Sequence, residues 1–303
     1  MIKEIVHKAE RPWLGILLIV LALQILPVSD AIAKYVSQAL PIIQVIWARF
    51  FFHCVLTGIY CGSKYGIASL IPSPKSVLFA RGAALFAAVS LFYITVHYLP
   101  MTTTLTLWFV EPFILTIMAV AFFREEVSAV GWCAVALGFV GILFAIRPDV
   151  IEFHFSYLAG LAAGVAYAVF LLLSRAIDEN SPPLVSVYHT GLVGCAASSA
   201  FMPFVWVPPS HSQWALLTGI GAVAACAHFF VVRAFAEAKA STLAPFTYTE
   251  IFAATILGYV IFDNVPSVST VLGLVLIAFS GILIAVRTQP VKPAEKALAG
   301  DAE

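Results

Sequence analysis

The chain has 303 residues, of which 62% are hydrophobic and only 11% are charged, and its mean hydropathy is +1.00. In soluble globular domains roughly a quarter of all residues are charged. The composition therefore excludes an ordinary soluble protein and indicates one that resides in lipid. The 16 basic residues balance the 16 acidic ones, and no basic stripe with interleaved aromatic residues indicates nucleic acid as a partner.

Apolar segments long enough to cross a hydrocarbon layer of about 30 Å follow one another along the whole chain. We expect ten membrane helices, at 13–33, 42–61, 79–98, 102–122, 128–146, 157–175, 184–206, 214–236, 242–262 and 268–286. Links rich in proline, such as IPSPKS near 72 and NSPP near 181, separate them. The segments are too long for the strands of an outer-membrane barrel and lack their alternation. The predicted fold class is therefore an all-α integral membrane protein.

The distribution of lysine and arginine predicts how these helices are oriented. With a cytoplasmic N-terminus, the cytoplasmic segments carry most of the basic residues, including Lys64 and Arg81. Lys34 and Arg147 fall on the other side, and Arg49 lies within a span. We therefore expect a multi-pass protein with both termini in the cytoplasm.

The fourth and fifth predicted helices resemble the ninth and tenth. Glu111 aligns with Glu250, and the ending VGILFAIR at Arg147 aligns with SGILIAVR at Arg287. Five helices in each half is an odd number, so the two halves must face opposite ways across the membrane. Inverted repeats are typical of secondary transporters, in which the binding site lies near mid-membrane between the halves.

Specific sequence stretches also resemble a known family. DAIAKYVSQALPIIQVIWARF, HYLPMTTTLTLWFVEPFILTIMAVAFFREEV, and the endings GILFAIR and GILIAVR are similar to those of the drug/metabolite transporter superfamily, in its EamA-type branch. The resemblance implies ten transmembrane helices arranged as two inverted five-helix EamA repeats. It places the first repeat at 13–148, the second at 157–288 and a polar cytoplasmic tail at 289–303. It also implies an inner-membrane carrier whose central cavity opens alternately to the two sides.

Two glutamates within apolar spans are the main candidates for binding the substrate. An unpaired charge in the bilayer is costly, so Glu111 and Glu250 need a partner, a cavity or a proton. Pro112 directly follows Glu111 and removes the backbone donor for the carbonyl group of Trp108. The other candidates flank the glutamates or end the third helix: Trp108, Thr104, Phe246, Tyr248, Tyr93 and His97.

Charged residues on the first two helices form a second group of candidates. Asp30 and Lys34 are one helical turn apart and Arg49 lies early in the next span, so we expect an ion-pair cluster that acts as a gate. The alternative is that the cluster only stabilises a helix end, with the lysine reaching toward the interface. The histidines show no metal-binding spacing, and His53 and His228 are expected to be packed side chains.

The predicted function is alternating-access transport of a small organic metabolite, without a cofactor or a metal. An aromatic cavity wall with two acids suits an amino acid or a related zwitterionic or cationic amphipathic compound. The alternative cargo is an aromatic vitamin or a nucleoside-like metabolite, such as riboflavin or S-adenosylmethionine. Either glutamate could also carry a coupling proton. An intramembrane enzyme is a distant alternative because G-x-S-x-G and H-E-x-x-H are missing from the sequence, and a channel is another.

Overall fold

A computed structural model describes residues 12–71, 76–123, 129–146, 154–175, 182–237, 246 and 249–287. All regular secondary structure within these ranges is helical, which confirms the predicted fold class. By length and composition, six helical stretches of the described residues could cross a membrane, and two further apolar stretches, Glu250–Phe262 and Val268–Ser280, are shorter. The tail predicted at 289–303 lies outside the described residues.

The helices of the first half follow the predicted spans closely, with one exception. They are α1 (Pro12–Val36), α2 (Ile42–Tyr65), the 3-10 helix η1 (Ile67–Leu70), α3 (Ser76–Tyr98), α4 (Met101–Trp108), α5 (Glu111–Phe123) and α6 (Ala129–Ile146). Prolines at the starts of α1, α2 and α4 suit the first turn, where a backbone donor has no partner within the helix.

The second half has a similar series of helices. They are α7 (Phe155–Arg175), α8 (Pro183–Ser199), the short α9 (Met202–Val205), α10 (His211–Glu237), α12 (Glu250–Phe262) and α13 (Val268–Arg287). Asp263 ends α12 in the left-handed conformation, and the backbone N–H of Asn264 donates to the carbonyl oxygen of Gly258. This is the pattern of a Schellman cap, which satisfies carbonyl groups at a helix end.

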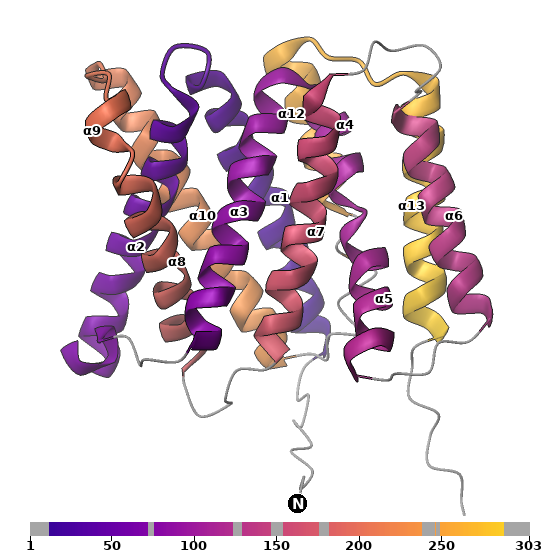
Figure 1. The fold of residues 1–303 in the computed structure, drawn as a ribbon, viewed down its shortest axis with the longest axis horizontal. Helices are drawn as coiled ribbons and strands as arrows, with labels where there is room; N and C mark the ends of the chain where they lie inside the picture. The colour runs from indigo at the N-terminus through magenta and orange to yellow at the C-terminus, as the bar shows by residue number, and fades with distance from the viewer. Residues whose placement is uncertain are drawn as a thin grey trace, which may run out of the picture.

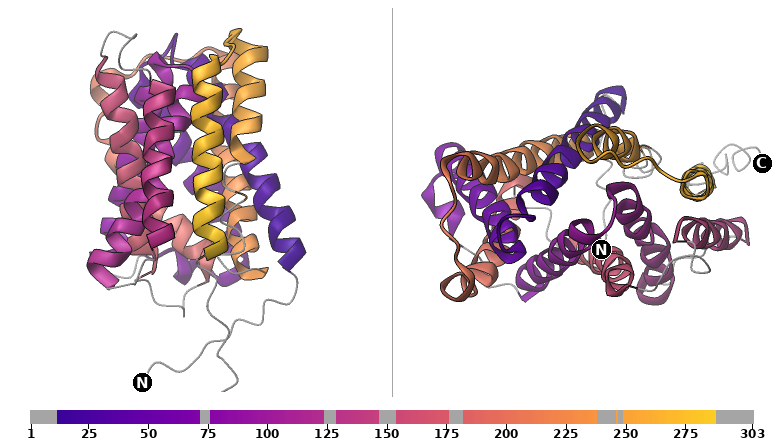
Figure 2. Two further views of the ribbon diagram at one scale, coloured as in Figure 1. Left: turned by 90° about the vertical axis from the view of Figure 1, so that its right-hand side faces the viewer. Right: turned by 90° about the horizontal axis from the view of Figure 1, so that it is seen from above.

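The long helices run roughly parallel to one another, and α1 begins at the same end of the bundle at which α13 finishes (Figure 1). We call this the termini end. The opposite end holds the connections from α1 to α2 and from α3 to α4. Figure 2 shows that α6 and α13 form a pair at one edge of the bundle.

Packing partners repeat when the halves are exchanged. Helix α1 packs on α10 just as α7 packs on α3, and α2 contacts α10 just as α8 contacts α3. The equivalent helices α2 and α8 pack on each other, as do α6 and α13. This correspondence is what a duplicated bundle with a pseudo-twofold relation requires.

The predicted continuous helix at 102–122 is wrong, because the chain is interrupted between α4 and α5. The backbone leaves the regular helix at Phe109 and Val110, and a new helix starts at Glu111. Pro112 is therefore the second residue of α5, where its missing N–H costs little, and does not lie inside a helix. Broken helices are tolerated at membrane depth where neighbouring helices cover them.

Gly164 of α7 is the neighbour that accommodates this break. A Cβ atom at Gly164 would lie 2.6 Å from the carbonyl oxygen of Trp108 and 2.6 Å from a methyl group of Val110. Only a residue without a side chain fits there. The small residues of α7 thus allow the irregular backbone to pack directly on the helix.

The close approach predicts the effect of one added methyl group. We expect Gly164→Ala to lower the free energy of unfolding by about 1–3 kcal/mol, because the Trp108 carbonyl must move away. Gly219→Ala is the matched control, since the nearest atom to a Cβ there is 3.9 Å away. Thermal unfolding of both variants in detergent measures the difference, and equal melting temperatures would contradict the close contact.

The predicted helix at 184–206 also differs from the structure. Helix α8 ends at Ser199 and is followed by α9 and an extended segment. The side chain of Gln44 pairs with this segment, since its Nε2 donates to the carbonyl of Val207 at 2.9 Å and its Oε1 accepts from the Val207 N–H at 3.1 Å. These two bonds connect α2 to the second half at the opposite end.

Candidate functional site

Both candidate glutamates begin a helix. Glu111 is the first residue of α5 and Glu250 is the first residue of α12. Since α4 has only 8 residues, or about 12 Å, the start of α5 lies well inside the bundle. The N-terminus of a helix carries a partial positive charge, so each of these two helix starts puts a carboxyl group beside a favourable dipole.

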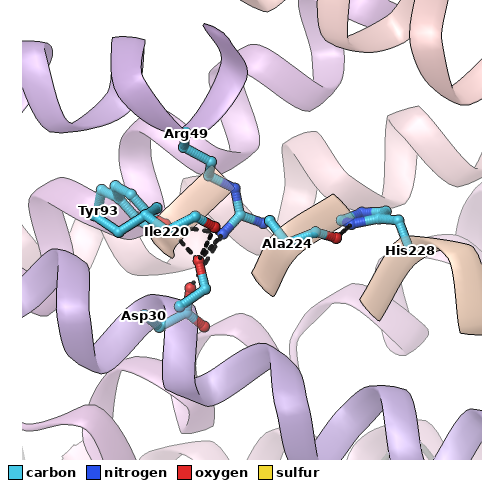
Figure 3. A network of polar contacts seen from close by, with 7 residues as sticks. Asp30, Arg49, Tyr93, Ile220, Ala224 and His228 are labelled. Atoms are coloured by element: carbon cyan, nitrogen blue, oxygen red, sulfur yellow. Dashed lines mark hydrogen bonds and ion pairs between the residues drawn. The ribbon is translucent and has the colours of Figure 1, made fainter. Parts of the chain in front are cut away.

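Arg49 forms the centre of a buried polar cluster that joins α1, α2, α3 and α10 (Figure 3). Its Nη1 donates to the hydroxyl oxygen of Tyr93 at 2.8 Å and to that of Ser29 at 3.2 Å. The same atom forms an ion pair with Asp30 at 3.4 Å. The Ser29 hydroxyl in turn donates to the carbonyl of Ile220 at 3.1 Å. Arg49 is 7% exposed and Asp30 is 5% exposed, so the pair lies in the interior.

The two glutamates differ in their surroundings. Glu250 is buried and interacts electrostatically with Arg49 and Asp30, so it belongs to the same charged cluster. Glu111 is only partly buried, and the charges of Arg49 and Asp30 do not act on it appreciably. Tyr167 of α7 interacts electrostatically with both carboxyl groups.

Lys34 does not join the Asp30–Arg49 pair. Its Nζ donates to the carbonyl oxygens of Val96 and Leu99, at 2.5 and 2.7 Å, where α3 ends. It also lies 5.4 Å from the ring centroid of Phe262, the last residue of α12. A cation is favourable at a helix C-terminus. Lys34 thus ties α1, α3 and α12 together at the opposite end.

A small cavity lies on the other side of Arg49, toward the termini end. Helices α2, α3, α7, α8 and α10 line it, and so residues of both halves contribute. Its volume is about 30 Å³, which is room for about two water molecules. None of the described lining residues is acidic, whereas two are arginines and two are histidines.

The second arginine of this cavity is Arg81 of α3. It is partly buried near the start of α3, at the termini end. Its Nη1 donates to the hydroxyl of Thr190 at 3.0 Å and more weakly to the carbonyl of Ser186 at 3.4 Å. The guanidinium carbon lies 4.8 Å from the ring centroid of Phe170, a cation–π distance. These contacts connect α3 to α7 and α8.

The two histidines line the same cavity as the arginines. The rings of His53 and His228 meet edge to face with centroids 5.4 Å apart. The Nδ1 of His228 lies 2.8 Å from the carbonyl oxygen of Ala224 (Figure 3). Because a carbonyl only accepts, Nδ1 carries the hydrogen.

Aromatic rings connect the region of Glu111 to Arg81. Trp108 packs on Phe92 at 5.1 Å and on Tyr167 at 4.6 Å between centroids. Tyr167 stacks on Phe170 at 5.4 Å, and Phe170 lies under Arg81. We call Trp108, Tyr167 and Phe170 the aromatic strip. One face of α7 presents two of its three rings.

The remaining predicted residues lie elsewhere. His97 accepts or donates a bond of 2.8 Å with Ser37 at the opposite end. The hydroxyl of Thr104 is buried and donates to the carbonyl of Pro100 in its own helix, so it does not face the cavity. Phe246 packs against α1 and α10. Tyr248 lies outside the described residues.

The structure adds Arg81, Tyr167, Phe170, His53 and His228 to the candidate site. Phe170 follows the small residues of 160–168 within α7, and Tyr167 is the one aromatic residue of that stretch. An aromatic residue within a run of small residues was the available signal for Tyr167. Arg81 follows a proline-rich link by only a few residues, so its position alone indicated an exposed charge.

Comparison with known proteins supports a common origin over nearly the whole chain. The model of the EamA-like transporter family matches residues 13–147 and again residues 154–286. A solved crystal structure superposes with a TM-score of 0.66 at 18% sequence identity. The match covers 90% of this chain and 96% of the chain in that structure. At that identity the likeness supports the fold alone.

The similar proteins include three with different named functions. The S-adenosylmethionine uptake transporter of Rickettsia prowazekii (strain Madrid E) is 27% identical over 87% of this chain and 89% of its own length. The riboflavin transporter of Vibrio cholerae is 26% identical over 60% of this chain and 61% of its own length. The pseudopaline exporter of Pseudomonas aeruginosa is 24% identical over 89% of this chain and 95% of its own length.

Proposed function

Because the chain belongs to the EamA-like transporter family, we propose that it carries a zwitterionic, amino-acid-derived metabolite with a ring system across the cell inner membrane. Family membership makes the chain a multi-pass membrane transporter of a small metabolite and not an enzyme. The cargo class, the inner membrane and a cytoplasmic position of both termini are the parts that we propose.

The proposed class of cargo is supported mainly by the separation of charges around the aromatic strip. Arg81 lies at one end, over Phe170, and Glu111 and Glu250 lie in the electrostatic range of Tyr167. A zwitterion with a ring can interact with the arginine, with the glutamates and with the aromatic strip, because aromatic faces stack on rings and attract cations. S-adenosylmethionine, which the similar rickettsial protein takes up, has this character. Riboflavin is the second candidate, supported by the same aromatic strip and by the similar Vibrio protein.

The small size of the cavity supports a mechanism of alternating access. A volume of about 30 Å³ cannot hold such a cargo, so the helices that line it must separate to admit one. We propose that the halves 13–148 and 157–288 move against each other. Opening at the opposite end then requires Lys34 to leave Val96, Leu99 and Phe262. A carboxyl group at a helix break is the position at which a coupling proton would bind.

Counterflow in sealed proteoliposomes tests the cargo. Vesicles loaded with unlabelled S-adenosylmethionine are expected to accumulate labelled S-adenosylmethionine with saturable kinetics, whereas vesicles loaded with riboflavin or with buffer are not. Accumulation only with riboflavin would replace the first cargo by the second. No saturable counterflow with either compound, by protein that is folded and correctly inserted, would contradict the proposed cargo class.

A further inference from the structure

The start of α12 is held by a side chain of α1. The amide Nε2 of Gln24 donates to the carbonyl oxygen of Thr249 at 2.8 Å. Thr249 directly precedes Glu250, so this hydrogen bond fixes the backbone next to the carboxyl group. Gln24 is partly buried, and its amide needs such a partner there. The bond joins the first half of the chain to the second.

A second contact between the same two helices lies at the end of α12. Lys34 of α1 lies 5.4 Å from the ring centroid of Phe262. Gln24 and Lys34 are about 15 Å apart along α1, and the 13 residues of α12 span about 20 Å. Both helices run toward the opposite end of the bundle (Figure 1). Helix α1 therefore contacts α12 at both ends, and Gln24 holds the end that carries Glu250.

The buried face of α12 combines Glu250 with two small residues, Ala254 and Gly258. Residues of this size let the helix lie close to its neighbours but have no side-chain hydrogen bond with which to fix the carboxyl group. The charge of Glu250 interacts with those of Arg49 and Asp30, and such an interaction weakens with distance. The position of the helix start therefore decides how strongly Glu250 interacts with the charged cluster.

The corresponding helix start in the first half is held differently. Helix α7 packs on α4 and α5 as α1 packs on α12. Gly164 of α7 lies close to Val110, the residue before Glu111, and a glycine makes room without offering a side-chain donor. The two glutamates are therefore not equivalent. The amide of Gln24 holds the residue before Glu250, whereas Glu111 follows a segment against which a glycine packs.

We propose that Gln24 is a positioning residue that holds the carboxyl group of Glu250 within the charged cluster around Arg49. Gln24 acts through Glu250 and does not contact the cargo. Glu250 is then the carboxyl group with the fixed position in the candidate site. The proposal rests on the proposed function, because Glu250 is one of the two carboxyl groups that function assigns to the cargo.

A double-mutant cycle on transport is the first test. Gln24→Met keeps the length of the side chain without its donor, and should lower the initial rate of S-adenosylmethionine counterflow about two- to tenfold, the range of one hydrogen bond. In the Glu250→Gln background the same change should lower the rate by less than about twofold, because the carboxyl group on which Gln24 acts is gone. Equal effects of Gln24→Met in both backgrounds would overturn the proposal.

The matched control for this cycle is Gln44→Met. It removes another side-chain amide that bonds to the backbone of the second half, at Val207 and away from Glu250. Its effect on the rate should therefore be the same with and without Glu250→Gln.

The second test does not depend on the identity of the cargo. Dicyclohexylcarbodiimide, an apolar reagent that modifies carboxyl groups within membranes, is added to the purified protein, and peptide mass spectrometry follows each glutamate. Buried Glu250 should react about two- to tenfold faster in Gln24→Met than in the wild type, because its helix start is released. Glu111 is the internal control and should react at the same rate in both proteins.

Two results of the labelling would contradict the positioning role: an unchanged rate at Glu250, or an equal rise at both glutamates, which would indicate general loosening. Gln44→Met should change neither rate. A rise confined to Glu250, in a protein without S-adenosylmethionine counterflow, would reject the cargo and keep the role of Gln24.

Discussion

Arg49→Met is expected to lower the free energy of unfolding by about 3–5 kcal/mol, because it leaves the carboxyl group of Asp30 buried without its cation. It also removes the donor that connects Tyr93 and Ser29 to α2. The unfolding of purified protein in mixed micelles of increasing denaturing detergent measures the loss. Transport should fall to background in the same variant.

The double variant Arg49→Met with Asp30→Asn distinguishes the effect of the ion pair on stability from its effect on transport. Because the second change removes the buried Asp30 charge that Arg49→Met leaves without its cation, the stability should recover to within about 1–2 kcal/mol of the wild type. Transport should stay at background, since Arg49 also lines the cavity. If the double variant were as unstable as Arg49→Met, the ion pair would not be the cause. If Arg49→Met alone transported normally, the cluster would have no role in the site.

Glu250→Gln and Glu111→Gln are each expected to reduce transport while leaving membrane insertion intact. Glu250→Gln should have the larger effect, about tenfold, because Glu250 is buried and its charge interacts with those of Arg49 and Asp30, and charges several ångströms apart inside a protein interact by more than about 1 kcal/mol. Glu111 lies outside that cluster, so Glu111→Gln should reduce transport less than Glu250→Gln does. Initial uptake rates in proteoliposomes measure both.

The matched control for the glutamates is Glu237→Gln. Glu237 lies at the end of α10, where it forms a surface ion pair with Arg233 at 3.5 Å. Such pairs contribute little to stability, so this variant should transport at the wild-type rate. Wild-type rates and pH dependence in both Glu111→Gln and Glu250→Gln would reject a role for the two carboxyl groups.

The helical fold could be predicted because every span in hydrocarbon must pair its own backbone N–H and C=O groups. Each apolar segment of sufficient length forms a helix to satisfy its backbone, so the bounds of α2 and α13 agree with prediction within a few residues. The break before Glu111 could not be predicted in the same way. It depends on Gly164, a residue of the other half that makes room for the irregular backbone.

The candidate site was only partly predictable for a related reason. Asp30 and Arg49 carry charges at adjacent helix ends, and proximity along the chain indicated a pair. Lys34 has equal proximity, yet the carbonyl groups at the end of α3 are better partners because a helix C-terminus attracts a cation. The cavity around Arg81 brings together five helices, and a single sequence does not state which faces of those helices meet.

The opposite directions of α5 and α12 have a consequence for the response to membrane voltage. Helix α5 runs from its break toward the termini end, and α12 runs from its first residue toward the opposite end (Figure 1). Each has 13 residues, so their dipoles are similar in size and point in opposite directions along the membrane normal. A field across the membrane therefore pulls on the two with nearly cancelling forces. A unit charge that crosses the full field gains or loses about 2.3 kcal/mol per 100 mV, so these two helix dipoles add little to the voltage response of a charged cargo or an accompanying proton.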